Sequence, residues 1–514
     1  MSSLTSLLLT PFIGALLVLL VPGNYRVVVR LVALLTTAVT AIKAIALFAA
    51  FQPGIADIQF EEQATWIPAA GLSYHLGVDG LNIGLVLMAS LVAFAAACVS
   101  WDIERQPKLF YLMLLTITGG ALGAFLSLDL FFLYFFNELA LVPTFLMMGI
   151  WGRGEQKNYA TFQITLYLTL GALVALTGLI ALYGMSGANT LDIVVLKAWL
   201  AEKPLTAQAQ ALVFPLLLFG FGTLVGLWPL HSWAAQGYAA APTATAMMHA
   251  GVLKKVGLYA LIRVALPLMP DGVARWMPVV AVLCLGNILY CGFVAMRQRD
   301  LALLLGNSSL AHMGFCFLGL ASVSVIGLTG VVVVMVAHGL LAALSFGLLG
   351  HFVRATGTSD LDKLGGLLRP MPFIGAATVM ALMAGCGLPG FANFPGEVTV
   401  MFGAWKTLPW FVVAAAWGGL IIGGVYMLRA IRDLLHGPVR PEFAKAADAG
   451  NLWRQLPFAV LLGALLWFGI TPGSLVERIK PAVAEVVKSA SAKSPAATTP
   501  AAHAPTATAL NSAH

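Results

Sequence analysis

The stretch Leu224–Arg263, LVGLWPLHSWAAQGYAAAPTATAMMHAGVLKKVGLYALIR, decides the fold class of this chain. Its first apolar segment is interrupted at Pro229 and passes through a polar patch that includes His231. A second apolar segment follows, with the adjacent lysines Lys254 and Lys255 near its middle. A lysine at the centre of a membrane-spanning helix costs roughly 2.5 to 3.5 kcal/mol on insertion scales. We therefore expect the two lysines to belong to an ion or proton path.

A structural role is the alternative for these lysines. In that case Lys254 snorkels to an interface, and Lys255 sits in a static ion pair. Snorkelling is difficult from the middle of a helix, because several apolar residues flank the pair on each side.

The composition points to the same class of protein. Of the 514 residues, 60% are hydrophobic and only 10% are charged, whereas soluble domains have about 25% charged residues. We therefore predict an all-α polytopic membrane protein. The net charge of +7 then reports orientation in the lipid bilayer. Binding to nucleic acid is not expected, because the sequence has no arginine-rich or aromatic-interleaved basic patch.

The sequence gives no sign of a cofactor on this chain. Its five cysteines lie in apolar stretches and form no CxxC pair, and motifs for zinc, iron–sulfur or haem attachment are absent from the sequence. Any electron transfer is therefore expected on another chain. The first apolar segment, 4–21, lacks a basic leader and is predicted to be a retained helix.

Fourteen membrane spans follow from about 20 apolar residues per span. They are 4–21, 27–51, 79–100, 108–127, 130–150, 160–184, 208–232, 241–265, 275–296, 300–321, 325–352, 372–404, 408–430 and 454–472. The seventh is broken at Pro229, and the twelfth is interrupted by Pro389, Gly390 and Pro395. Broken helices are tolerated only where they face protein or a wet cavity.

The two broken helices lie five spans apart, which suggests two inverted five-helix repeats. The predicted divisions are N-terminal helices 1–3 (1–107), a first repeat of helices 4–8 (108–270), a second repeat of helices 9–13 (271–432), a cytoplasmic loop with helix 14 (433–474) and a disordered tail (475–514). Basic residues gather in the loops after odd-numbered spans. The positive-inside rule then places both termini on the periplasmic or outer side of the cell inner (plasma) membrane.

Two glutamates and two histidines complete the candidate path. Glu138 and Glu397 lie in apolar segments, where a carboxylate needs a cation or a proton. Static pairing is the alternative for both. His312 and His338 lie in the tenth and eleventh spans, where an imidazole can pass a proton between its two nitrogens. As isolated residues they would be packing residues instead, and His249 is left without a role.

Several motifs now resemble one family, the antiporter-like subunits of respiratory complex I and of Mrp-type cation/proton antiporters. In chain order up to about residue 430 they are GVDGLN, NELALVP, PLHSW, APTATAMMHAGVLKKVG, NSSLAHMGF, AHGLLAALSF, DKLGGL and GLPGFANFPGE. The resemblance implies a fourteen-helix fold with inverted repeats and a proton path along a central polar axis.

The resemblance also implies roles for single residues. Glu138 matches the essential glutamate of the fifth helix, Lys255 the central lysine of the eighth, and Glu397 the residue of the twelfth helix near the exit. His312 and His338 match the histidines of the axis, and His231 is included in the path. Glutamate at the twelfth-helix position resembles the chain M (ND subunit 4-like) branch of the family, since the L and N branches have lysine there.

The sequence departs from the family in one motif, where the usual HxWLPDAHxxAPT is HSWAAQGYAAAPT, and at two further positions. The family's seventh-helix lysine is replaced by Leu224, and Lys254 stands where the family has an apolar residue. One hypothesis is that Lys254 takes over the role of the missing lysine as partner of Glu138. The competing hypothesis is a divergent paralogue with altered ion coupling, for which pumping would survive the substitution Glu138→Gln.

The expected function is proton translocation by a membrane-arm subunit of NADH:quinone oxidoreductase. The chain would be part of an enzyme only as a non-redox subunit, with NADH, FMN, iron–sulfur clusters and quinone on partner chains. Expected partners are the lipid bilayer and the other membrane-arm subunits, chains L- and N-like. The rival expectations are a subunit of an Mrp-type antiporter or of an ion-coupled hydrogenase or inorganic-carbon complex, and a scaffold subunit without transport.

Overall fold

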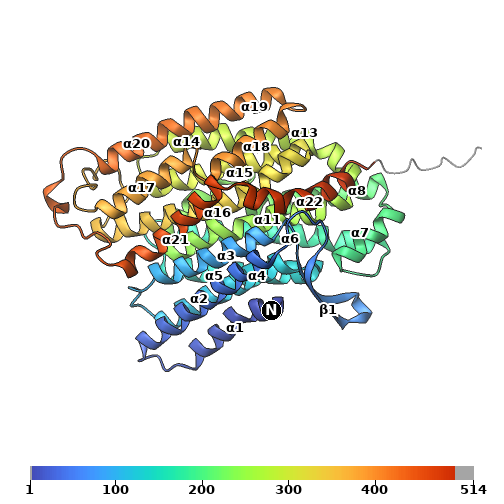
Figure 1. Ribbon diagram of the computed structural model, residues 1–514, viewed down its shortest axis with the longest axis horizontal. Helices are drawn as coiled ribbons and strands as arrows, with labels where there is room; N and C mark the ends of the chain where they lie inside the picture. The colour runs from blue at the N-terminus through green and yellow to red at the C-terminus, as the bar shows by residue number, and fades with distance from the viewer. Residues whose placement is uncertain (1–2, 493–514) are drawn as a thin grey trace, which may run out of the picture.

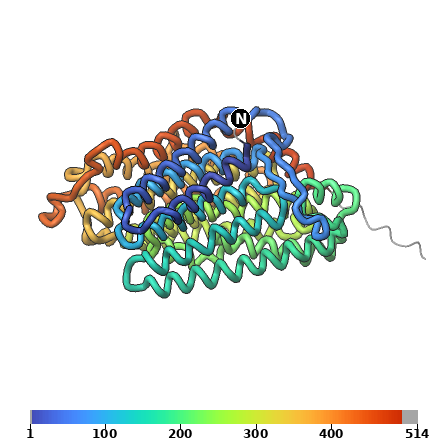
Figure 2. The backbone as a smooth tube through the Cα atoms, turned by 90° about the horizontal axis from the view of Figure 1, so that it is seen from below, coloured from blue at the N-terminus to red at the C-terminus, as the bar shows by residue number. Residues whose placement is uncertain are grey.

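The computed structural model describes residues 3–492, a range that is mainly helical and includes one small β-hairpin. The helices form one elongated bundle, and most of them run along its long axis (Figure 1). Figure 2 shows the same arrangement at right angles, with the first helices lying side by side along one flank of the bundle.

The elements up to the first interrupted helix are α1 (Leu4–Leu20), α2 (Arg26–Ala50), β1 (Gln59–Ile67), β2 (Leu72–Val78), α3 (Ile83–Val99), α4 (Pro107–Leu126), α5 (Leu130–Trp151), α6 (Lys157–Ser186), α7 (Ile193–Glu202), α8 (Ala207–Val225) and α9 (Ser232–Ala240). The next segment is divided into α10 (Thr243–Met248), the π-turn η2 (His249–Leu253), α11 (Lys254–Ala260), the π-turn η3 (Leu261–Ala265) and α12 (Leu266–Leu268).

The remaining elements are α13 (Pro270–Leu285), the π-turn η4 (Gly286–Tyr290), α14 (Cys291–Arg297), α15 (Leu301–Ser322), α16 (Val325–Thr356), α17 (Pro372–Gly385), α18 (Asn393–Trp405), α19 (Pro409–Ala416), the π-turn η5 (Trp417–Ile422), α20 (Gly423–Leu435), α21 (Leu452–Ile470) and α22 (Gly473–Ala490).

The predicted class, an all-α polytopic membrane protein, is confirmed. Within residues 3–492, ten helices are long and apolar enough to cross a membrane. Three shorter apolar helices accompany them, namely α1, α3 and α17. The eighth predicted span, 241–265, which contains Lys254 and Lys255, is not among the ten. The count of fourteen spans and the inverted repeat stay predictions.

The first break lies slightly earlier than predicted. Helix α8 ends at Val225, and Gly226 follows with a φ of 87°, a left-handed conformation that favours glycine. Asn287 of the neighbouring π-turn η4 supplies partners for the interrupted backbone. Its side chain accepts a hydrogen bond from the N–H of Trp228 and donates one to the carbonyl of Gly226, both at 2.8 Å. These backbone groups of the break therefore have hydrogen-bond partners inside the protein.

The second break separates α17 from α18, as predicted for the twelfth span. Gly387 and Gly390 adopt φ values of 70° and 101° in this turn. The N–H of Ala392 donates to the carbonyl of Leu465 in α21 at 3.0 Å. Both interrupted helices thus take hydrogen-bond partners from another segment of the chain, which a lipid-facing break could not do.

The C-terminal segment corrects one prediction. Residues 475–490 belong to the predicted disordered tail, but α22 occupies them and packs against α16 and α12. Its apolar residues Leu475, Ile479, Val483 and Val486 recur at helical spacing and are buried. The average composition of the tail, rich in small and polar residues, concealed this stripe. The rest of the predicted tail, 493–514, lies outside the described residues.

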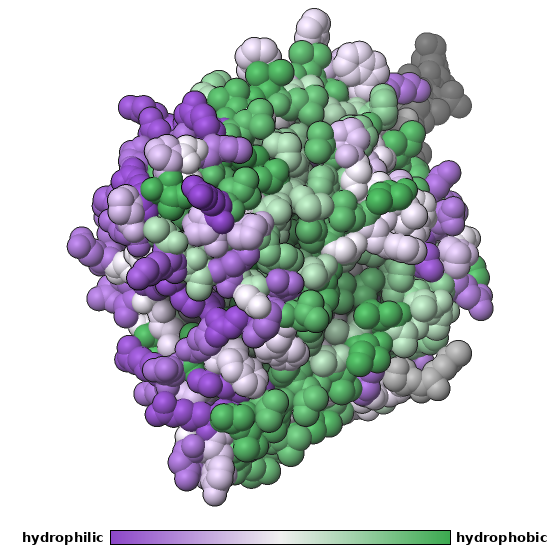
Figure 3. All heavy atoms as spheres, turned by 60° about the vertical axis from the view of Figure 1, so that its left-hand side comes forward, coloured by the Kyte–Doolittle hydropathy of each residue, from purple (hydrophilic) through white to green (hydrophobic). Residues whose placement is uncertain are grey.

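The hairpin of β1 and β2 was not anticipated either. The two strands are antiparallel, with irregular register near both ends of the pairing. With α7, the hairpin lies at the end of the molecule opposite to the loop between α20 and α21 (Figure 1). The surface agrees with a membrane protein, because hydrophilic side chains gather at one end and hydrophobic ones cover much of the remaining face (Figure 3).

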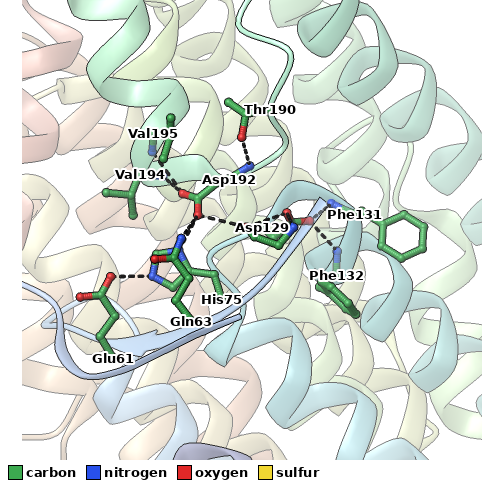
Figure 4. Close-up of polar contacts among 11 residues, drawn as sticks. Glu61, Gln63, His75, Asp129, Phe131, Phe132, Thr190, Asp192, Val194 and Val195 are labelled. Carbon is green, nitrogen blue, oxygen red and sulfur yellow. Dashed lines mark hydrogen bonds and ion pairs between the residues drawn. The ribbon is translucent and has the colours of Figure 1, made fainter. Parts of the chain in front are cut away.

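A hydrogen-bonded cluster of Glu61, His75, Asp129 and Asp192, named the clasp, holds the hairpin to the helices (Figure 4). His75 of β2 is buried and has a carboxylate on each ring nitrogen. Its Nε2 lies 2.7 Å from Oε1 of Glu61 in β1, and its Nδ1 lies 2.7 Å from Oδ2 of Asp192. Asp192 caps α7, while the neighbouring Asp129 caps α5 and accepts from the N–H of Ser73. Only a protonated imidazole can donate to both carboxylates.

The electrostatics of the clasp agree with that protonation state. Burial acts to lower the pKa of His75, but the hydrogen bonds and charges of Asp192 and Glu61 outweigh it, and the pKa is raised. Burial acts in the opposite direction on Asp192, where the hydrogen bond from His75 and the N–H of Val195 prevail and the pKa is lowered. The clasp therefore favours imidazolium between two carboxylates.

We predict that the clasp stabilises the protein in a pH-dependent way. Because the pKa of His75 is raised in the folded state, its contribution is fully present below the unfolded value of about 6.5 and is lost as the pH rises through the folded pKa. In thermal unfolding of the detergent-solubilised protein, His75→Gln should lower the Tm most at acidic pH.

The matched control is His351→Gln, because His351 bonds the carbonyl of Ala447 and no carboxylate. The pH dependence of its effect on the Tm should differ from that of His75→Gln. A Tm difference between parent and His75→Gln that is constant from acidic to alkaline pH would contradict the prediction.

Candidate functional site

The two central lysines lie where the helix geometry changes. They begin α11, directly after the π-turn η2, and such turns occur often at functional sites. Both side chains are completely buried, with 0% of their surface exposed. Lys254 therefore does not snorkel to an interface. Within residues 3–492, no carboxylate lies within 4.0 Å of either ammonium group, so Lys255 is not held in a static ion pair.

Lys255 begins a row of buried polar side chains. Its Nζ donates to the carbonyl of Ala250 at 2.5 Å, and lies 2.9 Å from Nδ1 of His338 in α16. The ring of His338 lies 5.4 Å, between centroids, from the ring of His312 in α15. Nδ1 of His312 in turn lies 2.7 Å from Oε1 of Glu397 in α18.

Four predicted residues are thus brought together from four helices: Lys255, His338, His312 and Glu397. The row can carry a proton in principle, because each histidine has two nitrogens and each end group can hold or release a proton. Glu397 has an imidazole within hydrogen-bond distance, so static pairing of this carboxylate stays open as an alternative.

Glu138 lies apart from this row. It is partly exposed, and its carboxylate accepts a hydrogen bond from the side-chain amide of the adjacent Asn137 at 3.1 Å. Within the described part of the chain it forms no ion pair. It shares one face of α5 with the exposed residues Phe135 and Val142. The structure does not place Glu138 beside a lysine.

Lys254 points in a different direction from the one hypothesised. Its Nζ donates to Oγ of Ser309 in α15 at 3.1 Å, and lies 5.2 Å from the centre of the ring of Tyr238. Consecutive residues in a helix differ by about 100° in direction, which accounts for the different partners of the two lysines. In this structure Lys254 is therefore a neighbour of α15 and not the partner of Glu138.

His231 also lies outside the row. It stands at the N-terminus of α9, where Nδ1 donates to the carbonyl of Pro229 at 3.2 Å and the ring packs against Tyr290. It is partly exposed rather than buried. The prediction that it belongs to the proton path gains no support from these contacts.

Sequence reasoning missed several buried polar groups near the row. Ser308 and Ser309 precede His312 on α15, and Ser308 accepts a hydrogen bond from the hydroxyl of Tyr426 at 3.1 Å. The adjacent serines in NSSLAHMGF were a usable signal, because two hydroxyls in the middle of an apolar helix need partners. His249 packs against Trp233 and Tyr238, and among the residues that the structure describes neither ring nitrogen has a hydrogen-bond partner.

A polytopic helical bundle with two interrupted helices and a buried row of lysine, histidine and glutamate is typical of ion-translocating membrane proteins. The model of the family described as NADH:quinone oxidoreductase/Mrp antiporter, transmembrane, matches residues 127–423. The chain belongs to this family, and the resemblance inferred from the motifs is confirmed.

Individual relatives agree over nearly the whole length. The chain is 32% identical to NADH-quinone oxidoreductase subunit M of Rhodobacter capsulatus, over 90% of this chain and 91% of the relative. It is 34% identical to subunit M of Pseudomonas aeruginosa, over 92% and 94%. Among solved structures, a chain of respiratory complex I from Thermus thermophilus with bound NADH matches with a TM-score of 0.86 and 28% identity, over 95% of this chain and 99% of that one.

The Mrp complex of Dietzia sp. DQ12-45-1b has the same fold. One of its chains matches with a TM-score of 0.80 and 21% identity, over 96% of this chain and 100% of that one.

We predict that His312 and Glu397 are energetically coupled. Removing one partner of a buried hydrogen-bonded pair leaves the other polar group unsatisfied, which typically costs about 1 to 3 kcal/mol. In detergent, His312→Ala and Glu397→Gln should each lower the Tm, and the double variant should lower it by less than the two separate shifts combined. Additive shifts would show that the two groups are not coupled. His351→Ala with Glu397→Gln is the control pair and should be additive.

Proposed function

We propose that this chain is a proton-translocating membrane-arm subunit of an NADH:quinone oxidoreductase, of the subunit M type. The observation that carries the proposal is the buried row from Lys255 through His338 and His312 to Glu397. The identity to subunit M relatives over at least nine tenths of the chain supports the assignment to this type of complex.

The chemistry of the row is a sequence of proton transfers. Lys255 gives a proton to Nδ1 of His338, and the imidazole releases one from its other nitrogen. The step from His338 to His312 needs a bridging water, because the two rings lie 5.4 Å apart between centroids. His312 passes the proton to Glu397 across the 2.7 Å contact. Moving one charge against 100 mV requires about 2.3 kcal/mol, which redox chemistry elsewhere in the complex supplies.

The remaining expectations become part of this proposal. The chain itself carries no redox group, and NADH, FMN, iron–sulfur clusters and quinone are held by partner chains. It assembles with other membrane-arm subunits, similar to chains L and N, in the cell inner membrane. Both termini face the periplasmic side, as the distribution of basic loop residues favours.

We predict that Lys255→Ala abolishes proton pumping while the complex still assembles. The substitution removes the donor that contacts His338 and leaves no other group at that position to hold the proton. The measurement is NADH-driven acidification in proteoliposomes that contain the purified complex, with quinone reduction followed in parallel. Lys406→Ala, a lysine exposed after α18, is the control and should pump like the parent.

Pumping by Lys255→Ala at the rate of the parent would remove the basis of the proposed function. It would favour a scaffold subunit, provided that Glu138 and Glu397 can also be neutralised without consequence.

The second candidate is a subunit of a secondary cation/proton antiporter. The observation in its favour is the shared fold with a chain of the Dietzia Mrp complex. Ion movement that requires sodium and continues without NADH would support this candidate. Acidification that requires NADH and continues without sodium would support the oxidoreductase.

A further inference from the structure

Lys254 has hydrogen-bonding capacity that the protein leaves unused. A lysine ammonium group has three donors, and within residues 3–492 Nζ of Lys254 makes one hydrogen bond, to Oγ of Ser309. The second lysine of the pair, Lys255, uses the carbonyl of Ala250 and Nδ1 of His338. The two lysines therefore contact different helices, α15 and α16, although they are adjacent in the chain.

The charge state of the pair is restricted by its surroundings. Both side chains are completely buried, and none of the carboxylates in residues 3–492 lies within 4.0 Å of them. Two like charges in one low-dielectric site repel each other strongly. The pair is therefore expected to hold one proton more readily than two.

A small cavity connects the partners of the two lysines. It has a volume of about 20 Å³, and its polar lining residues are Ser308, Ser309, His312, His338 and Ser345. A cavity of roughly 10 to 15 Å³ can hold a water molecule if two to four polar groups line it. Ser309 accepts from Lys254 and makes no other hydrogen bond with the described residues, so its hydroxyl proton is free to be donated.

We propose that Lys254 and Lys255 share one proton and exchange it through Ser309, one water molecule in this cavity and His338. Lys254 is then a second protonation site of the path, one that reloads Lys255. The inference rests on the proposed function, because it concerns the supply of protons to the same buried row. It goes further by giving Lys254 and Ser309 a role that the row itself does not require.

Each transfer in the exchange balances. Lys254 gives a proton to the hydroxyl oxygen of Ser309 as that hydroxyl gives its own proton to the water. The water passes a proton to Nε2 of His338, and Nδ1 of His338 releases its proton to the neutral amine of Lys255. The net result is that Lys254 becomes neutral and Lys255 becomes an ammonium ion. His338 changes tautomer and is left as the acceptor at Nδ1, which is one of the two arrangements compatible with the 2.9 Å contact.

The first test requires no substitution. A high-resolution map of the purified complex should show an ordered water within hydrogen-bond distance of Oγ of Ser309 and Nε2 of His338. A cavity without water would overturn the inference. Because the step from His338 to His312 also needs a bridging water, the proposed function is tested separately, by the pumping rate of Lys255→Ala.

The second test measures proton pumping in proteoliposomes. Proton relays contribute roughly 100-fold or more to the rates of the steps they serve, so Ser309→Ala and Lys254→Leu should each slow pumping at least about tenfold. Because both residues lie on one branch of the path, the double variant should pump at about the same rate as either single variant. Ser309→Thr keeps the hydroxyl and should retain most of the rate.

The control is Ser90→Ala, which removes a buried hydroxyl that donates to the carbonyl of Val86 in its own helix. It should pump like the parent. If Lys255→Ala abolishes pumping while Ser309→Ala and Lys254→Leu pump normally, the shared-proton branch is wrong and the proposed function stands. If Lys255→Ala also pumps normally, the proposed function itself is wrong.

Discussion

The burial of two adjacent lysine side chains, with no carboxylate of residues 3–492 within 4.0 Å of either, is the constraint on which the rest of the site depends. An unpaired charge in a low-dielectric interior is expensive, so each lysine needs neutral groups that can accept from it. The protein supplies a backbone carbonyl and His338 to Lys255, and Ser309 to Lys254. Because these partners come from α15 and α16, the requirement ties the central helix to both. Partners that are themselves able to exchange protons make the same arrangement suitable for translocation.

The two interrupted helices solve a related problem for the backbone. A break inside the bilayer leaves N–H and carbonyl groups that lipid cannot satisfy. Asn287 bonds the backbone of Gly226 and Trp228 in the first break, and a carbonyl of α21 accepts from the second. The breaks are therefore fixed by neighbouring segments and can stay close to the buried lysines and to Glu397.

Much of this could be predicted from residue types. Apolar segments of sufficient length predicted the class of fold, and prolines and glycines predicted the two breaks. A lysine, a glutamate and two histidines in apolar segments were predicted for the proton path, and these four form the buried row. The direction in which each side chain points was harder to predict. The sequence does not show that Lys254 contacts α15, or that Glu138 lies on an exposed face of α5, because both depend on how each helix is rotated in the bundle. Composition alone also concealed α22, whose narrow apolar stripe was averaged with polar residues.

The central claim is that this chain moves protons as part of a redox-driven complex. The most direct measurement is to tag the chain, isolate the complex in mild detergent, reconstitute it in liposomes and follow internal acidification after addition of NADH and quinone in sodium-free buffer. The account predicts that quinone-reductase chains co-purify with the tagged chain and that acidification follows NADH oxidation. Recovery with antiporter-like chains alone, without NADH:quinone reduction, would contradict it.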